Sequence, residues 1–442
     1  MKYFGTDGFR GKVNEVLTVD HAIKIGKFLG YYYSGKTENA RCVIGKDTRR
    51  SGYMFEYALV AGLTSTGCDV DLLHVTTTPS VSYITRTEKY DFGIMITASH
   101  NPFYDNGIKI IDGNGMKMDE EILQQCEDYI DGITTVELAE NEAVGRAQDY
   151  MQGRNHYMNY LTTTLNESMR GYKIGLDCAN GASFMIAKSV FDMLGADTFV
   201  INNQPDGFNI NRNCGSTHIE ELQKYVRQNR LDIGFSFDGD ADRCLAVDEN
   251  GNIVDGDMII YILGCYLKEQ GALKDNTVVT TIMSNLGITK ALERQGIANV
   301  QTAVGDKYVS EEMNAHGYNI GGEQSGHVII SKYATTGDGV LTALQVMSVL
   351  IKKKCPLSAL VSDVTLYPQV LINVTVPNPD AALAAQSVKD CVKDCEQKMG
   401  DKGRVVLRKS GTEPLVRVMV ECEDDALCKQ YANEIKNAVV NA

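Results

Sequence analysis

Phe92-Gly93-Ile94-Met95-Ile96-Thr97-Ala98-Ser99-His100-Asn101-Pro102 is the stretch of sequence that indicates the fold most clearly. An apolar run of five residues leads to an Asn-Pro pair that stops it, and this pattern predicts a buried parallel strand. Ligands of open α/β sheets bind beyond the carboxyl ends of such strands. We therefore expect Ser99 to lie where a fold of this kind presents a nucleophile.

Other catalytic interpretations of this segment fit its residues less well. A hydrolase nucleophile elbow requires glycine two positions before and two positions after the serine, whereas this chain has Thr97 and Asn101 there. His100 is not expected to act as the base for Ser99, because neighbouring side chains of an extended chain point to opposite faces. Taken alone, the Ser-His-Asn-Pro segment also fits an ordinary turn, so the other motifs of the chain have to decide its function.

The composition is that of a folded protein with several domains. The chain has 442 residues, 43% hydrophobic and 23% charged, and is too long for a single core. Its formal net charge of -14 opposes binding to nucleic acid and to anionic lipid, so a local basic pocket would have to attract an anionic substrate. No apolar run approaches the roughly 18 residues of a membrane span, and the first residues lack the apolar stretch of a signal peptide. We expect a cytoplasmic protein with no nucleic-acid or membrane partner, and its oligomeric state stays open.

The 12 cysteines show no spacing typical of a metal site. Cys391 and Cys395 form a close pair, but they have helical spacing and no partner histidines. Small buried thiols in a reducing compartment are therefore expected, and no zinc site is predicted.

Alternating strand-like and helical patterns predict α/β structure along most of the chain. Strand-like runs at 41–45 and 173–177 precede helical stretches at 51–67 and 184–194. Each such unit is predicted to be an α/β domain.

The second half of the chain continues this pattern and then changes. An amphipathic helix at 258–267 precedes a strand-like run at 277–281, and a long helix follows from about 338 to 353. After two prolines, a strand-like run at 370–374, one helix at 381–398, two further strand-like runs and a closing helix predict a smaller α+β unit. The predicted domains are 1–150, 151–255, 256–365 and 366–442.

Asp238-Gly239-Asp240-Ala241-Asp242-Arg243 places three carboxylates at alternate positions, separated by residues too small to block their convergence. Converging carboxylates repel one another unless a cation neutralises them, and Mg²⁺ suits oxygen ligands that phosphate or water completes. A calcium loop would share its acidic positions, including Glu249 at the twelfth, but needs glycine where this chain has Arg243. A merely solvated acidic turn is the remaining alternative.

Arg408-Lys409-Ser410-Gly411-Thr412-Glu413-Pro414, with Arg417 close behind, has the composition of a phosphate-binding loop. Arginine binds two phosphate oxygens at once, and consecutive backbone N–H groups around glycine form an anion nest. An ordinary turn between strands is the alternative.

Gly321-Gly322-Glu323-Gln324-Ser325-Gly326-His327 combines flexible backbone with four side chains that can bind sugar hydroxyls. His327 alone could equally be a structural histidine or a proton carrier. No Gly-x-x-x-x-Gly-Lys-Ser/Thr pattern occurs, so the sequence does not imply ATP binding.

Together these motifs resemble the α-D-phosphohexomutase superfamily. Their order and spacing match along essentially the whole chain, with one motif in each predicted domain. The resemblance implies a four-domain phosphohexomutase architecture, in which three similar mixed α/β domains and a smaller α+β C-terminal domain surround a central cleft. The motifs that carry it are Thr97-Ala98-Ser99-His100-Asn101-Pro102, Asp238-Gly239-Asp240-Ala241-Asp242-Arg243, Gly322-Glu323-Gln324-Ser325-Gly326 and Arg408-Lys409-Ser410-Gly411-Thr412-Glu413-Pro414.

Within the superfamily, the chain is most similar to the branch that acts on glucosamine phosphates. Thr97 and Ala241 stand where that branch usually has serine and glycine, and both are closer to the enzymes for glucose and mannose phosphates, which remain the alternative. The similarity to the glucosamine branch lies in Tyr3-Phe4-Gly5-Thr6-Asp7-Gly8-Phe9-Arg10-Gly11, Asn101-Pro102-Phe103-Tyr104-Asp105-Asn106-Gly107-Ile108-Lys109 and Thr335-Thr336-Gly337-Asp338-Gly339.

The resemblance implies an isomerase-class enzyme, an intramolecular phosphotransferase that feeds amino-sugar nucleotide synthesis. It would interconvert the 6- and 1-phosphates of a hexosamine or hexose through a phosphoserine enzyme and a 1,6-bisphosphate intermediate. The implied cofactors are Mg²⁺ and glucosamine or glucose 1,6-bisphosphate as activator. More distant alternatives are a metal-dependent sugar-phosphate phosphatase and a non-catalytic sugar-phosphate sensor.

The same resemblance assigns roles to particular residues. Ser99 would be the phosphoserine, and the order of proton transfer between Lys109 and His327 stays open. The implied metal ligands are Ser99, Asp238, Asp240 and Asp242; the implied catalytic residues are Ser99, Lys109, His327, Arg10 and Arg243. The implied substrate-binding residues are Lys307, Glu323, Ser325, Arg408, Ser410, Gly411, Thr412 and Arg417.

Overall fold

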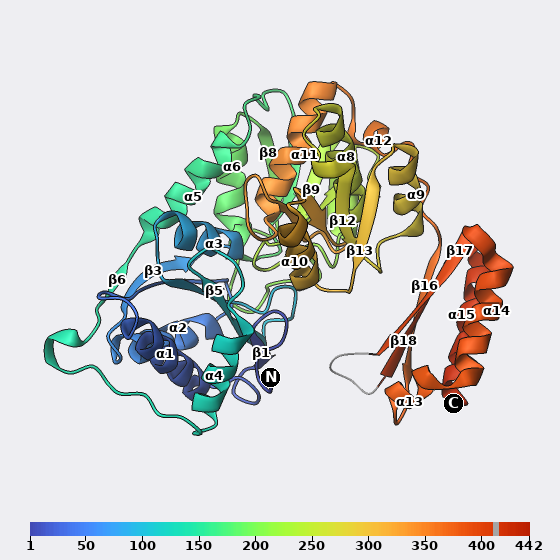
Figure 1. The fold of residues 1–442 in the computed structure, drawn as a ribbon. Coiled ribbons are helices and arrows are strands. Elements are labelled where there is room, and N and C mark those ends of the chain that lie inside the picture. The colour runs from blue at the N-terminus through green and yellow to red at the C-terminus, as the bar shows by residue number, and fades with distance from the viewer. Residues whose placement is uncertain (410–414) are drawn as a thin grey trace.

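The structure is a computed structural model that describes residues 1–409 and 415–442. It contains four sheets, each built from one continuous part of the chain (Figure 1). The first three sheets mix parallel and antiparallel strands, whereas the last is a smaller antiparallel sheet. The predicted architecture of three mixed α/β units followed by a smaller α+β unit is therefore confirmed.

The first sheet has six strands in the order β1-β5-β4-β2-β3-β6. Its elements are β1 (Phe9–Lys12), α1 (Val19–Ser34), β2 (Arg41–Lys46), α2 (Ser51–Thr64), β3 (Asp69–Val75), α3 (Thr78–Thr87), β4 (Phe92–Ile96), β5 (Asp105–Asp112), α4 (Glu120–Ile130), a 3₁₀ turn (Asn141–Ala143) and β6 (Ala147–Asp149). All five residues of β4 are buried, and β4 pairs in parallel with β2 and antiparallel with β5. The apolar run that precedes Ser99 is thus the buried parallel strand that its sequence predicts.

The second sheet has five strands in the order β11-β10-β9-β7-β8. Its elements are α5 (Met151–Thr163), β7 (Lys173–Asp177), a 3₁₀ turn (Ala182–Phe184), α6 (Ile186–Met193), β8 (Asp197–Ile201), α7 (Glu220–Asn229), β9 (Ile233–Phe237), β10 (Cys244–Val247) and β11 (Ile253–Val254). Every residue of β9 is buried, and the acidic loop follows this strand directly.

The third sheet has four strands in the order β13-β12-β14-β15. Its elements are α8 (Gly256–Glu269), a 3₁₀ turn (Lys274–Asn276), β12 (Thr277–Thr281), α9 (Leu286–Arg294), β13 (Ala298–Thr302), α10 (Asp306–His316), β14 (Ile320–Gly322), β15 (Val328–Ile330), α11 (Gly339–Lys353) and α12 (Leu357–Leu360). The prediction that the first of these helices is amphipathic is wrong, because residues 256–264 of α8 are all buried. This helix contacts strands of both the second and the third sheet, and the two domains share one hydrophobic core.

The fourth sheet has three antiparallel strands in the order β16-β18-β17. Its elements are β16 (Gln369–Thr375), α13 (Pro379–Ala384), α14 (Gln386–Met399), a 3₁₀ turn (Gly400–Lys402), β17 (Gly403–Lys409), β18 (Leu415–Cys422) and α15 (Asp425–Val440). Where one helix was predicted there are two, because Ala385 has an extended backbone with ψ near 133°. Asn378 caps the first of them, and Pro379 stands in its first turn.

The fourth domain has its own core and meets the third domain through polar contacts. The Arg404 guanidinium donates to the carbonyl of Ser284 and, over 2.6 Å, to the buried Glu421 carboxylate. Asn285 and Tyr367 exchange two hydrogen bonds of 3.0 Å across the same junction. Domain four is therefore attached at one end of its sheet (Figure 1).

All twelve cysteines lie in the described part of the chain, and none forms a disulfide. Within residues 1–409 and 415–442, no helix is both long and apolar enough to cross a bilayer.

The first three sheets share one strand pattern. Counted from β2, β7 and β12, the first strand lies between the second and third and parallel to both, and a fourth strand (β5, β10 or β15) returns antiparallel to the third. Helices connect the parallel strands, because such a connection has to return from one end of the sheet to the other. The turn from the third to the fourth strand therefore lies at the same edge of all three sheets.

Close helix packing in the first domain predicts one effect on stability. A Cβ atom at Gly62 of α2 would lie 2.4 Å from the carbonyl oxygen of Ile23 in α1. We expect Gly62→Ala to destabilise the protein by about 1–3 kcal/mol, since the two backbones have to separate. Urea unfolding followed by circular dichroism measures this, with the exposed neighbour Ala61→Ser as a control that shifts stability by less than about 0.5 kcal/mol. An unchanged Gly62→Ala midpoint would contradict the packing.

Candidate active site

Three of the predicted functional loops occupy the same position in the shared strand pattern. Ser99 lies between β4 and β5, the acidic loop of residues 238–243 lies between β9 and β10, and residues 323–327 lie between β14 and β15. The loops also contact one another. The Ser99 hydroxyl donates a hydrogen bond to the Asp238 carboxylate, and the Cys244 N–H donates to the Gly326 carbonyl over 3.0 Å. The repeated topology thus brings segments more than 200 residues apart in sequence to one place.

Ser99 is buried at a sharp turn that ends β4. Its φ of 50° lies in the left-handed region. Its hydroxyl donates to Asp238 Oδ2 over 2.6 Å, and its N–H donates to Thr97 Oγ1 over 3.0 Å. The candidate nucleophile of the first domain is therefore in direct contact with the acidic loop of the second.

The prediction that His100 points away from Ser99 is wrong. The chain is not extended at Ser99, and the left-handed turn brings His100 Nδ1 to 3.4 Å from Ser99 Oγ and 3.3 Å from Arg243 Nη1. Burial, together with Arg243 and Arg10, lowers the pKa of His100 to about 4. The imidazole is therefore uncharged near neutral pH.

The carboxylates of Asp238, Asp240 and Asp242 converge in the interior, with one oxygen of each within 4.8 Å of the others. The small residues between them are required by this packing, since a Cβ atom at Gly239 would lie 2.5 Å from the Ser99 carbonyl oxygen, and Ala241 has a φ of 56°. Burial raises the pKa of Asp238 well above its usual range, and Asp242 and Asp240 add to this effect. Such a cluster calls for a neutralising cation.

The oxygen atoms of this cluster fit a divalent cation. Asp240 Oδ1 and Asp242 Oδ1 are buried without a hydrogen-bond partner in the described residues. Their second oxygens accept hydrogen bonds from Lys109, and Asp240 Oδ2 also accepts one of 2.5 Å from the Thr78 hydroxyl. Mg²⁺ prefers carboxylate oxygens of this kind.

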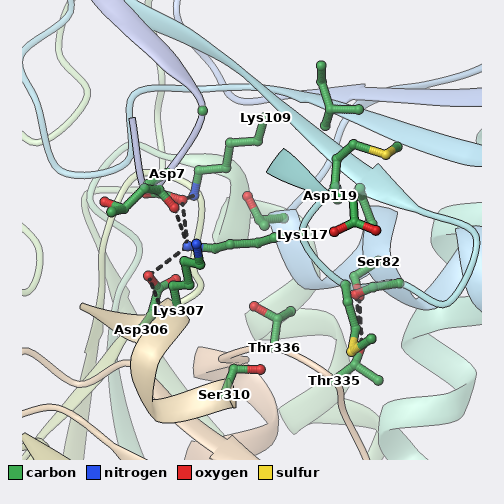
Figure 2. A pocket seen from close by; sticks show the side chains of 18 of the residues that line it. Asp7, Ser82, Lys109, Lys117, Asp119, Asp306, Lys307, Ser310, Thr335 and Thr336 are labelled. Atoms are coloured by element: carbon green, nitrogen blue, oxygen red, sulfur yellow. Dashed lines mark hydrogen bonds and ion pairs between the residues drawn. The ribbon is translucent and has the colours of Figure 1, made fainter. Parts of the chain in front are cut away.

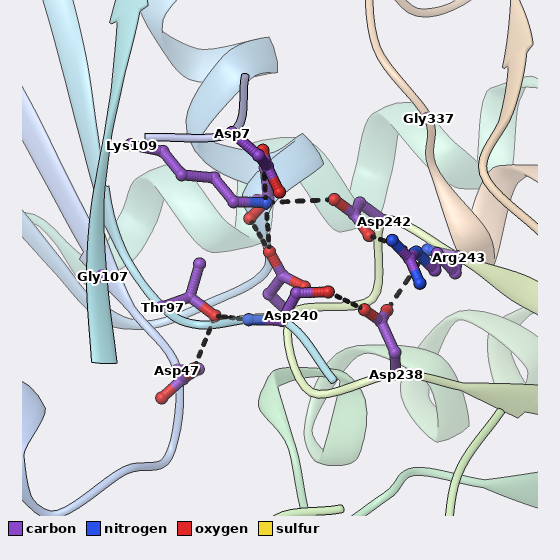
Figure 3. A network of polar contacts seen from close by, with 12 residues as sticks. Asp7, Asp47, Thr97, Gly107, Lys109, Asp238, Asp240, Asp242, Arg243 and Gly337 are labelled. Carbon is purple, nitrogen blue, oxygen red and sulfur yellow. Dashed lines mark hydrogen bonds and ion pairs between the residues drawn. The ribbon is translucent and has the colours of Figure 1, made fainter. Parts of the chain in front are cut away.

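Lys109 projects from β5 into the acidic loop (Figure 3). Its Nζ lies 2.9 Å from Asp240 Oδ2, 3.1 Å from Asp242 Oδ2 and 3.3 Å from Asp7 Oδ1. Burial favours the neutral amine, but Asp240, Asp242 and Asp7 outweigh it and raise the pKa of Lys109 well above its usual range. Lys109 is therefore an ammonium group in this structure.

A cavity of about 370 Å³ opens beside Lys109, between the first and third domains (Figure 2). Lys117 crosses this cavity, with its Nζ 2.7 Å from Asp306 Oδ1 and 3.6 Å from Asp7 Oδ1. Asp242 of the second domain also lines this cavity. The predicted site residues that line the cavity are Lys109, Asp242, Lys307 and His327.

Besides Lys109, three further predicted basic residues have carboxylate neighbours. Arg10 pairs with Asp7, and Lys307 pairs with Glu120 at the cavity wall. Arg243 is mostly buried beside the acidic loop, where its Nε lies 4.0 Å from Asp242 Oδ1. All three cations thus lie at the edge of the site rather than free in solvent.

His327 is buried at the start of β15. The Gly337 N–H donates to its Nε2 over 3.3 Å, and Asp306 Oδ2 lies 3.6 Å from the same nitrogen. Nδ1 has no partner in the described part of the chain. Because Nε2 accepts a hydrogen bond, the uncharged ring carries its hydrogen on Nδ1, which is free to donate to a ligand.

Glu323 and Ser325 of the glycine-rich loop differ in their contacts. Glu323 Oε1 accepts a hydrogen bond of 3.0 Å from the Gly305 N–H. Ser325 has a buried hydroxyl without a partner among the described residues. A substrate hydroxyl could therefore bond to Ser325 without displacing a protein group.

Arg408 and Arg417 lie directly opposite each other on β17 and β18. Burial and the charge of Arg417 lower the pKa of Arg408. The buried Nε atoms of both arginines lack partners within the described segments. Two adjacent positive charges are suited to binding an anion. The predicted residues Ser410, Gly411 and Thr412 lie outside the described residues.

Several residues that build the site were not predicted from the sequence. Asp7 and Asp306 each stand beside glycine in short Gly- and Asp-containing segments, a composition that was available as a signal. Thr78 and Lys117 carry no such signal, because only the fold brings them near the acidic loop and the cavity. The missed residues are Asp7, Thr78, Lys117 and Asp306.

Comparisons with known proteins cover nearly all of the chain. Four domains described as phosphoglucomutase/phosphomannomutase match in order: alpha/beta/alpha domain I at residues 1–137, domain II at 150–251, domain III at 255–367 and the C-terminal domain at 371–438. A phosphoglucosamine mutase of Lachnoclostridium phytofermentans is 56% identical over 435 residues, which are 98% of this chain and 97% of that protein.

Solved structures show the same fold. A phosphoglucomutase/phosphomannomutase family protein from Burkholderia thailandensis has a TM-score of 0.83 at 20% identity and covers 99% of this chain and 96% of its own. The N-acetylphosphoglucosamine mutase of Aspergillus fumigatus, solved in complex with GlcNAc-6P and magnesium, has a TM-score of 0.72 at 18% identity, covering 99% of this chain and 95% of its own.

The acidic cluster predicts stabilisation by Mg²⁺. Raising Mg²⁺ to 100 times its dissociation constant should stabilise the protein by about 2.7 kcal/mol, because the ion binds only the folded cluster. Titration calorimetry should show one site, weakened about tenfold or more in Asp240→Asn. The exposed Asp275→Asn is the matched control and should bind as the unaltered chain does. Equal binding by Asp240→Asn would rule out this cluster as the metal site.

Proposed function

Because this chain belongs to the phosphoglucomutase/phosphomannomutase family, we propose that it is a phosphoglucosamine mutase, which interconverts glucosamine 6-phosphate and glucosamine 1-phosphate. The curated relative with more than half of its residues identical over nearly the full length bears that name. The geometry that supports the proposal best is the bond of 2.6 Å between the Ser99 hydroxyl and Asp238, which sets a nucleophile against a buried acidic cluster.

In this proposal Ser99 carries a phosphoryl group between turnovers. A hydroxyl of the sugar monophosphate attacks that phosphorus, the bond from phosphorus to Ser99 Oγ breaks, and the hydroxyl proton passes to a protein base. The resulting 1,6-bisphosphate reorients in the site. The bond from its other phosphorus to the sugar oxygen then breaks, that phosphoryl group is transferred to Ser99 Oγ, and the released sugar oxygen takes up a proton. Phosphate is thus moved between O6 and O1 without consumption of an external donor. A bound glucosamine or glucose 1,6-bisphosphate would serve as activator by restoring the phosphoserine.

The residues around Ser99 suit charge stabilisation and proton transfer. Asp238, Asp240 and Asp242 would hold Mg²⁺ with the phosphoserine, and the ion would lower the charge on the transferring group. Arg243 adds a fixed positive charge beside the cluster, and Lys109, as an ammonium, can donate a proton to a leaving oxygen. In this assignment His327, whose Nε2 accepts the Gly337 N–H, donates from its free Nδ1 to a substrate oxygen.

The distal phosphate needs a second anion site, which we assign to the fourth domain. Arg408 and Arg417 oppose each other there, and the loop that contains Ser410, Gly411 and Thr412 joins their strands. Glu323, Ser325 and Lys307 would bind the sugar, and Arg10 would support the phosphoserine. Closure of the fourth domain would exclude water, which otherwise competes for the phosphoryl group.

Substrate preference tests the proposal. With Mg²⁺ and a trace of glucose 1,6-bisphosphate, kcat/KM for glucosamine 6-phosphate should exceed that for the 6-phosphates of glucose, mannose and N-acetylglucosamine by about tenfold or more, because the site has to recognise the 2-amino group. Ser99→Ala should be inactive with each of them. A preference for glucose or mannose 6-phosphate would instead establish the alternative suggested by Thr97 and Ala241. Release of inorganic phosphate without isomerisation would establish a phosphatase.

The distal anion site has its own test. Arg408→Ala should raise KM about 10- to 100-fold, because charge-assisted hydrogen bonds contribute about 1.5–3 kcal/mol. The neighbouring Lys409→Ala is the control, since this exposed lysine pairs with Asp380. Unchanged KM in Arg408→Ala would remove this residue from the substrate site.

A further inference from the structure

A second polar network lies beneath the Ser99 turn and takes no part in the reaction described above. Its centre is Arg49, whose side chain is fully buried just after β2. The guanidinium pairs with Asp47, and Nη2 donates to the carbonyl of Ser99 over 3.1 Å and to that of Asn101 over 2.5 Å. A buried arginine thus binds the backbone on both sides of His100.

Asp47 connects the same arginine to the other end of the turn. Its Oδ1 accepts the Arg49 N–H over 2.8 Å, and its Oδ2 accepts the Thr97 hydroxyl over 2.6 Å. Thr97 Oγ1 in turn accepts the Ser99 N–H. The hydrogen bonds therefore form a closed ring through Asp47, Thr97, Ser99 and Arg49. Figure 3 shows the contact between Asp47 and Thr97.

The second domain binds the same two carbonyl groups. Asn211 Nδ2 donates to Ser99 over 2.8 Å and to Asn101 over 3.1 Å. Asn211 is itself held in the left-handed region with a φ of 57°, and its N–H donates to the Ala179 carbonyl over 2.9 Å. The turn that carries the nucleophile is therefore held by hydrogen bonds from both the first and the second domain.

These contacts oppose the strain of the turn. A left-handed backbone costs a residue other than glycine about 1–2 kcal/mol, so an isolated Ser99 would leave this conformation. The ring and Asn211 together supply one hydrogen bond to its N–H and two to its carbonyl. With the backbone fixed on both sides, the Ser99 Cβ atom keeps one direction, from which the hydroxyl reaches Asp238.

We propose that Arg49, acting with Asp47, Thr97 and Asn211, is the positioning residue that fixes the Ser99 turn for phosphoryl transfer; this inference rests on the proposed function. None of these four residues would touch substrate, and their effect would pass entirely through the backbone of Ser99 and Asn101. Arginine is required rather than lysine, because one group has to bind the carboxylate and two carbonyls in fixed directions.

The test compares Arg49→Lys with Arg50→Ala. The adjacent Arg50 is exposed, with its guanidinium over the Phe208 ring, so it controls for loss of a cation at this place in the chain. We expect Arg49→Lys to reduce kcat about 100-fold with less than a threefold change in KM, since displacement of a reacting group by about 1 Å costs this much. The rate at which Ser99 takes up label from isotopically labelled glucose 1,6-bisphosphate should fall in parallel. Arg50→Ala should leave both rates unchanged.

A second pair keeps the inference testable if Arg49→Lys does not fold. Thr97→Ser retains the hydroxyl and should keep at least a third of the activity and labelling rate, whereas Thr97→Val keeps the shape without the hydroxyl and should lose about tenfold or more of both. Equal rates in Thr97→Val and Thr97→Ser, or an Arg49→Lys kcat within threefold of the unaltered chain, would overturn the positioning role. If the unaltered chain itself takes up no label, the proposed function fails instead.

Discussion

Three buried carboxylates that cannot coexist without a compensating cation are the constraint on which the rest of the structure depends. Asp238, Asp240 and Asp242 approach one another within 4.8 Å, and two of their oxygens have no partner in the described residues. The Lys109 ammonium offsets part of their repulsion, and the proposed Mg²⁺ would offset the rest. The Ser99 hydroxyl donates a hydrogen bond to this cluster. A cation that neutralises the cluster would therefore also lie beside the phosphoryl group in the proposed transfer.

The fold meets this constraint by repetition. Three domains use the same strand pattern, and in each the turn from the third strand to the antiparallel fourth carries one part of the site. Glycines allow these turns to touch, as at Gly239 against the Ser99 carbonyl and at Gly326 against the Cys244 carbonyl. The second and third domains share one core, whereas the fourth is joined through a small polar junction, which suits the closure proposed for it.

Local patterns in the sequence were enough to predict β4, the acidic loop and the succession of four α/β and α+β units, because each depends on residues close together in the chain. The family resemblance that these motifs carry is confirmed over the four matched domains. Other features depend on contacts between distant residues. Arg49 and Asn211 lie 50 and 112 positions from Ser99, and no spacing rule connects them.

Backbone geometry accounts for the remaining differences. The predicted orientation of the His100 side chain is wrong because a strand pattern does not reveal that Ser99 adopts a left-handed backbone conformation. The break at Ala385 lies in an alanine-rich segment with no glycine or proline at that position to signal it. The most direct test of the account is a chase experiment, in which protein labelled by isotopic glucose 1,6-bisphosphate is mapped by peptide and then mixed with unlabelled glucosamine 6-phosphate. The account predicts label on the Ser99 peptide that moves to the sugar within one turnover; active protein whose polypeptide never carries label would contradict it.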